Sequence, residues 1–172
     1  MVSIQDIQKT SASSFEPEVI AVHPEGIPHA LKARPQWVVW KREERDGKPT
    51  KVPYSPVSFE RASTTDLMTW GSFEDAFAAW RIDNFDGVGF CFCSADPFVG
   101  IDIDACRNPE TGEIEEWAQH LIERFEGAYI EVSPSGKGVH IIACGRLQSG
   151  KRSGPIEMYD QRRFFTVTGV VI

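Results

Sequence analysis

Asp102 and Asp104 stand two residues apart in the apolar segment VGIDIDAC. Because side chains alternate between the two faces of a strand, the flanking isoleucines should face a core while the two aspartates share the opposite face. Carboxylates that lie so close raise each other's pKa unless a cation or hydrogen-bond donors stabilise them. Mg²⁺ or Mn²⁺, which prefer oxygen ligands, would do so. An exposed strand face with two solvated aspartates is the alternative.

A glycine-rich loop, SPSGKG at residues 133–138, lies between two predicted strands. Backbone N–H groups in such a turn can point at an anion, and lysine and serine side chains add charge and a donor. His140 follows on the strand face opposite to Val139, and it is a candidate for a phosphate contact. A hydrogen-bonded core histidine is the alternative. The candidate nucleotide-binding residues here are Ser135, Gly136, Lys137, Gly138 and His140.

A third acidic strand, PIEMYD, adds another carboxylate. By alternation Glu157 and Tyr159 face away from the core, so Glu157 is the better third carboxylate and Asp160 is the alternative. Arg163 precedes the next strand and is either a phosphate contact or a solvated turn residue. Three carboxylates, a loop with glycine, lysine and serine, and a histidine together indicate metal–nucleotide chemistry, as in two-metal phosphoryl transfer.

Two other motifs lack a residue that their function requires. An EF-hand loop starting at Asp102 would need glycine at its sixth position, where Arg107 stands. GRLQSGK, residues 145–151, matches the start of a P-loop, but Arg152 replaces the serine or threonine that would hold Mg²⁺. We therefore interpret 145–151 as a basic hairpin loop.

Hairpins and helices must position these residues. A helix is predicted over 71–82, with Ser72 as N-cap and Asp75 at the capping-box position. A second helix is predicted over 113–125, with one apolar stripe made by Trp117, Leu121 and Phe125. Strands are predicted over 36–44, 50–56, 87–93, 98–104, 128–133, 138–144, 155–160 and 164–172. This order is typical of an α+β fold rather than a doubly wound parallel sheet.

The chain has 172 residues, is 41% apolar and carries a net charge of −7. We expect a loosely ordered lead-in over residues 1–30 and one domain over 31–172. The polar N-terminus has no signal-peptide pattern, and no apolar run approaches the ~20 residues of a membrane span. We therefore expect a cytoplasmic protein without membrane contact. The acidic charge disfavours a general DNA-coating surface.

GIDIDAC, SPSGKGVHI and IEMYDQRRFFTVTG together resemble motifs of the archaeo-eukaryotic-type primase–polymerase superfamily. The similarity is greatest to the N-terminal primase–polymerase domains of phage and plasmid replication proteins, and it covers about residues 27–169. It implies an RRM-like catalytic core sheet with flanking helices and an N-terminal α/β module. It also implies that Asp102, Asp104 and Glu157 bind two catalytic Mg²⁺ or Mn²⁺ ions. The loop ending in His140 would contact the phosphates of the incoming nucleotide.

The resemblance implies a DNA primase or DNA polymerase that acts in phage or plasmid replication, in the cytoplasm of a bacterial or archaeal host. Its partners would be a single-stranded DNA template, a primer, dNTP or NTP, and a helicase or helical accessory domain. Because the chain ends at Ile172, directly after TVTG, we expect a domain truncated at its C-terminus or a short stand-alone form. Lys51 and Tyr54 are further candidates for substrate contacts, with a structural strand as the alternative. A non-catalytic module that binds single-stranded nucleic acid or nucleotides is the alternative function.

Overall fold

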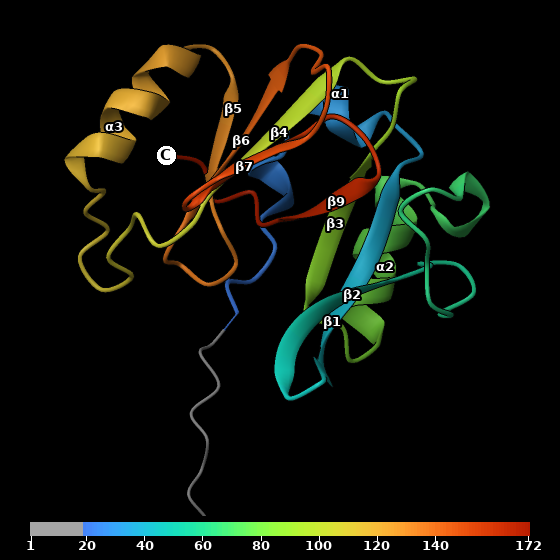
Figure 1. The fold of residues 1–172 in the computed structure, drawn as a ribbon. Helices are drawn as coiled ribbons and strands as arrows, with labels where there is room; N and C mark the ends of the chain where they lie inside the picture. The colour runs from blue at the N-terminus through green and yellow to red at the C-terminus, as the bar shows by residue number, and fades with distance from the viewer. Residues whose placement is uncertain (1–18) are drawn as a thin grey trace, which may run out of the picture.

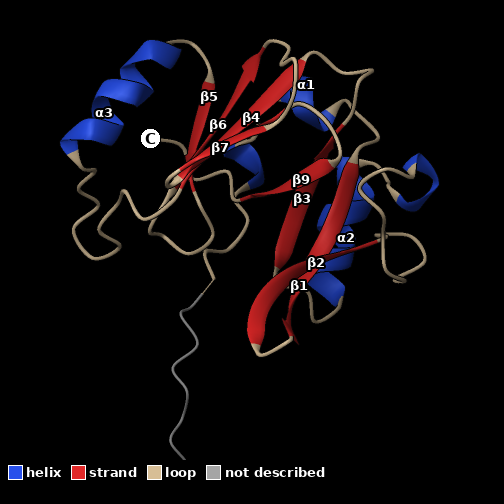
Figure 2. Ribbon diagram, viewed as in Figure 1, coloured by secondary structure: helices blue, strands red, loops and turns tan. Residues whose placement is uncertain are grey.

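Two antiparallel β-sheets form the framework of the computed structural model, which describes residues 19–172 (Figures 1 and 2). The four-stranded sheet has the order β2-β1-β3-β9, made of β1 (Trp37–Arg45), β2 (Lys48–Tyr54), β3 (Gly87–Phe92) and β9 (Arg163–Val167). The five-stranded sheet has the order β5-β6-β4-β8-β7, made of β4 (Phe98–Ile103), β5 (Tyr129–Val132), β6 (Val139–Cys144), β7 (Lys151–Ser153) and β8 (Ile156–Tyr159). The mixed α+β class is confirmed, while the finer RRM-like description stays a prediction.

The helices are few and short. They are α1 (His29–Lys32), α2 (Phe73–Ile82) and α3 (Glu116–Ile122), with 3₁₀ turns over Pro24–Gly26, Leu67–Thr69 and Glu123–Phe125. Figure 1 shows α2 against one face of the four-stranded sheet and α3 beside the five-stranded sheet. No helix in the described part of the chain is long and apolar enough to cross a bilayer.

The sequence pattern predicted the start of α2 correctly and the apolar stripe of α3 only in part. Ser72 Oγ accepts a hydrogen bond from Asp75 N at 3.0 Å, and Asp75 Oδ2 accepts one from Ser72 N at 3.1 Å, which confirms the capping box. In α3, Leu121 packs on the sheet as predicted, but Trp117 is 39% exposed. The Trp117 indole donates instead to Glu115 at the solvent-facing start of the helix.

The packed domain begins earlier in the chain than the expected residue 31. Residues 1–18 of the expected lead-in lie outside the described residues. Val22, Ile27 and Leu31 are buried in the core, and His23 N donates to Thr168 O at 2.7 Å. The sequence shows no regular apolar period here because short turns, rather than a long helix or strand, bury these side chains.

The two sheets pack closely at Gly100 of β4. A Cβ atom there would lie 2.6 Å from Phe92 Cζ and 2.7 Å from Phe165 Cε2, and both rings are buried. Gly100→Ala is therefore expected to lower the free energy of unfolding by about 1–3 kcal/mol, measured by urea titration. Gly145→Ala is the matched control, because its Cβ would meet only Val99 Cγ2, at 3.3 Å. Equal losses in both variants would contradict this explanation.

Candidate active site

The register of the five-stranded sheet aligns five polar residues in one row. Glu131 of β5 pairs with His140 of β6, and His140 pairs with Asp102 of β4. Asp102 pairs in turn with Glu157 of β8, and Glu157 pairs with Arg152 of β7. Directly paired residues share a face of the sheet. The apolar residues on the other face pack with α3; they are Val99, Ile101, Ile103, Val139 and Ile141.

Asp102 lies on this face, as the alternation predicted. Asp102 Oδ1 is buried and accepts no hydrogen bond from the described residues. His140 Nε2 lies 3.6 Å from this oxygen, which is beyond a good hydrogen bond. A buried carboxylate oxygen without a donor costs free energy unless a cation compensates it. This oxygen therefore fits the oxygen-ligand chemistry expected of the pair.

Asp104 follows the end of β4 and is exposed, yet its carboxyl group is electrostatically coupled to the row. Loss of surrounding water raises the pKa of Asp104, and the nearby Asp102 and Glu157 carboxylates raise it further. Lys51 and His140 act in the opposite direction on this pKa. The three predicted carboxylates therefore share one electrostatic neighbourhood.

Of the two candidates for the third carboxylate, only Glu157 lies beside Asp102. Its Oε1 atom is 3.0 Å from Nη1 of Arg152, which is exposed on the edge strand. Asp160 is buried and accepts a hydrogen bond from Leu147 N at 3.0 Å, so it supports the loop before β7. Within residues 19–172 no three acidic, histidine or cysteine side chains form a ready metal-binding group. The carboxylates are therefore neighbours rather than a complete coordination sphere.

The backbone N–H groups of the glycine-rich loop donate hydrogen bonds to oxygen atoms of the same loop. Gly136 N donates to Ser133 O at 2.8 Å, Lys137 N to Ser135 Oγ at 3.3 Å, and Gly138 N to Ser133 Oγ at 3.1 Å. The three amides expected to point at an anion are thus engaged within the loop. The side chains of Ser135 and Lys137 are exposed, and Ser135 Oγ also lies 3.2 Å from Ser133 Oγ.

The loop lies against the acidic pair. A Cβ atom on Gly138 would be 2.7 Å from Ile103 O and 3.5 Å from Asp104 Cα. Arg107 fixes this arrangement because its Nη1 atom donates to Gly136 O at 2.8 Å. The loop backbone at Gly138 therefore lies next to Asp104.

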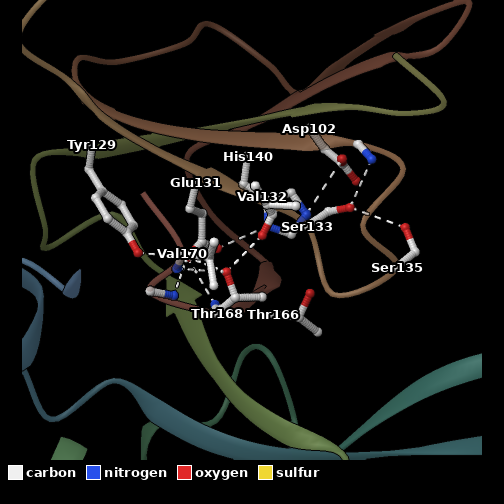
Figure 3. Close-up of polar contacts among 12 residues, drawn as sticks. Asp102, Tyr129, Glu131, Val132, Ser133, Ser135, His140, Thr166, Thr168 and Val170 are labelled. Carbon is white, nitrogen blue, oxygen red and sulfur yellow. Dashed lines mark hydrogen bonds and ion pairs between the residues drawn. The ribbon is translucent and has the colours of Figure 1, made fainter. Parts of the chain in front are cut away.

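His140 is 3% exposed and sits between two carboxylates (Figure 3). Its Nδ1 atom is 3.2 Å from Glu131 Oε1, and its ring centroid lies 5.4 Å from that of Phe165 on β9. His140 is therefore a hydrogen-bonded core residue, as the alternative interpretation had it, and it borders Asp102. Its contact with a phosphate stays a prediction. Glu131 was not predicted, because only the strand register shows that it faces His140.

Positive charge faces the row from the four-stranded sheet. Lys51 Nζ donates to Thr166 Oγ1 at 3.3 Å, and Lys51 pairs directly with Arg42 across β2 and β1. Loss of surrounding water lowers the pKa of Lys51, the Asp102 and Asp104 carboxylates oppose this, and Arg42 adds to the lowering. Lys51 is thus close to the acidic pair, although the two lie on different sheets.

Arg163 and Tyr54, the other two candidates for substrate contacts, lie in different parts of the structure. Arg163 is exposed, and its guanidinium carbon lies 4.8 Å from the ring centroid of Tyr159, which shares the face of Glu157. Tyr54 donates its hydroxyl to Glu43 on the neighbouring strand. Arg163 therefore lies over the ring of Tyr159, whereas the Tyr54 hydroxyl is engaged in a hairpin contact.

Comparison with known proteins assigns the chain to the primase–polymerase family. It is 36% identical over 149 residues to the protein named DNA Primase-polymerase of Nitratiruptor phage NrS-1. The match covers 83% of this chain, and the chain spans only 20% of the length of that protein. No family model matches the chain. The family expected from the three motifs is thereby confirmed.

Proposed function

We propose that the chain is the catalytic domain of a metal-dependent DNA primase–polymerase of phage replication, which adds nucleotides to a primer 3′-hydroxyl. The observation that carries this proposal is the pairing of Asp102 with both His140 and Glu157, together with the buried, unpartnered Oδ1 of Asp102. The similarity to a phage primase-polymerase supports the same conclusion.

Asp102, Asp104 and Glu157 would hold Mg²⁺ or Mn²⁺, since all three carboxylates lie in one electrostatic neighbourhood. Such ions stabilise the charge of the attacking and leaving oxygens in phosphoryl transfer. The chain's own cations would bind the triphosphate: Lys51 from the four-stranded sheet, Lys137 from the loop and Arg163 from the edge of β9. Ser135 would add a hydrogen-bond donor, and His140 would contact a phosphate at the inner edge of the site.

The substrates in this proposal are a single-stranded DNA template, a primer, and dNTP or NTP. A helicase or a helical accessory domain would be the protein partner. A non-catalytic module that binds nucleotides or single-stranded nucleic acid is the second candidate function. The ion pair between Glu157 and Arg152 favours this second function, because Arg152 engages a carboxylate that would otherwise be one of the three proposed metal ligands.

Removal of divalent metal tests the proposal directly. The chain is expected to extend a labelled primer on a DNA template with Mg²⁺ or Mn²⁺, and EDTA should abolish extension because the carboxylates then repel the triphosphate. Re-addition of the ion should restore extension. Binding of single-stranded DNA without incorporation under any of these conditions would support the non-catalytic module instead.

Arg152→Ala is expected to tighten Mn²⁺ binding, because it releases Glu157 from its ion pair. The Arg152 side chain is exposed, so the free energy of unfolding should change by less than about 1 kcal/mol. Isothermal titration of Mn²⁺ alone measures the affinity. Lys151→Ala is the matched control, since it removes the same charge from the preceding position of β7. Equal affinity changes in the two variants would indicate a general charge effect and contradict the role of the ion pair.

A further inference from the structure

Glu131 is a fully buried carboxylate with an unusually complete set of donors (Figure 3). Its Oε2 atom accepts hydrogen bonds from Tyr129 Oη at 2.6 Å, Gly169 N at 2.7 Å and Thr168 N at 2.9 Å, and Thr168 Oγ1 lies 3.2 Å from it. Its other oxygen, Oε1, faces only His140 Nδ1 in the hydrogen bonds of the described residues, at 3.2 Å. One oxygen is therefore anchored to the backbone, and the other is directed at the histidine.

The anchor comes from the TVTG segment at the end of β9. The single hydroxyl proton of Thr168 is donated to Val132 O at 2.7 Å, so the segment is bound to β5 at Val132 as well as at Glu131. Gly169 has a φ of +75°, and a Cβ atom there would lie 1.9 Å from His23 O. Only glycine fits this turn, which brings two consecutive backbone N–H groups to a single carboxylate oxygen.

We infer that Glu131 is a positioning residue that holds the proton of His140 on Nδ1 and directs Nε2 at the acidic pair. The three donors to Oε2 fix the orientation of the carboxylate, so Oε1 can only accept from the imidazole. Because both side chains are buried, no water competes for Nδ1. Where this inference connects His140 to turnover it rests on the proposed function, but the placement of the proton does not.

Glu131→Gln provides a sharp test because it preserves shape and changes only the donor pattern. The glutamine carbonyl must take the position of Oε2, since an amide NH₂ there would face three donors. The NH₂ group then faces His140 Nδ1, which must become the acceptor. The proton should therefore move to Nε2, and the tautomer should invert.

Nitrogen-15 NMR of the metal-free full chain reads the tautomer without any activity. In the wild type, His140 should show a protonated Nδ1, and in Glu131→Gln an unprotonated Nδ1 with a protonated Nε2. Glu116→Gln is the matched control, because it makes the same chemical change at an exposed position of α3 and should leave His140 unaltered. An unprotonated Nδ1 in the wild type, or an unchanged tautomer in a folded Glu131→Gln, would overturn the inference. The wild-type spectrum alone decides the matter if Glu131→Gln fails to fold.

Primer extension then separates positioning from a merely structural role. Glu131→Gln should lower kcat/KM for the nucleotide by roughly 10–100-fold, the scale of losing a residue that orients a site histidine. In a His140→Ala background the same change should have no further effect, because its only route is through the imidazole. Additive losses would show that Glu131 acts otherwise. Absence of extension by the wild type would count against the proposed function and leave the NMR result standing.

Discussion

Replacing Asp102 and Asp104 together by asparagine is expected to reduce nucleotide incorporation at least about 10³-fold while the domain stays folded. Asparagine keeps the shape of both side chains but removes the charge that would hold Mg²⁺ or Mn²⁺. No internal hydrogen bond is lost at Asp102 Oδ1, which accepts none from the described residues. The loss should therefore appear in turnover rather than in stability.

The raised pKa of Asp104 gives the sign of the stability change. A carboxyl group whose pKa is higher in the folded state than its unfolded value of 3.8 destabilises the fold at pH values above the folded pKa. This cost fades as the pH falls through the folded pKa toward 3.8. The double asparagine variant should therefore be no less stable than the wild type at neutral pH, as thermal melts would show.

Metal-dependent stabilisation provides a second measurement on the same variants. Mn²⁺ should raise the Tm of the wild type, because a ligand that binds only the folded state stabilises it, and should leave the Tm of the double variant unchanged. Glu123→Gln with Glu126→Gln is the matched control, since it removes two exposed carboxylates beside α3. Undiminished incorporation by the aspartate double variant would refute the assignment of the site.

The alternation of side chains along each strand was enough to predict which face Asp102, His140 and Glu157 share. Asp102, His140 and Glu157 each stand opposite to apolar neighbours in their own strands, and the structure places all three on one face. Alternation gives the face of each residue but not the register between strands. The direct pairing of Asp102 with Glu157, and the exclusion of Asp160, depend on that register.

The rest of the site depends on contacts between distant segments. Glu131 looks like an ordinary strand residue until the TVTG turn and His140 are seen around it. Lys51 was a candidate from the sequence, but its place near the acidic pair could not be predicted, because its strand belongs to the other sheet. For the loop amides, the sequence suggested a contact that the structure does not leave open. SPSGKG has the composition of an anion-binding turn, but the N–H groups of Lys137 and Gly138 donate to serine side chains of the same loop. Local patterns cannot show which of two hydrogen-bond partners is nearer.

Replacement of Lys51 is the second change expected to have a large effect on nucleotide incorporation. It lies on β2 and bonds Thr166 on β9, and the carboxylates of Asp102 and Asp104 are among the charges that act on it. A cation opposite an acidic pair is suited to a triphosphate that arrives with its metal ions. Lys51→Met keeps the length of the aliphatic stem and removes the charge, so it isolates the electrostatic contribution.

Lys51→Met is expected to lower kcat/KM for the incoming nucleotide about 10²-fold, the scale of removing one donor from a charged site. Most of the loss should appear as a higher KM if Lys51 binds phosphate equally in the ground state and the transition state. Lys51→Arg should retain more activity than Lys51→Met because it keeps the charge. Lys48→Met, at the exposed hairpin end of the same strand, is the matched control and should behave as the wild type.

The pH profile of Lys51→Met distinguishes this role from a structural one. Lys51 lowers the pKa of Asp104, so its removal should let that pKa rise. The proton then competes with the metal at higher pH, and incorporation should begin to fall at a higher pH in Lys51→Met than in the wild type. A variant that only disturbed packing would lose activity equally at every pH. A parallel profile with unchanged KM would show that Lys51 supports β9 through Thr166 and does not face the substrate.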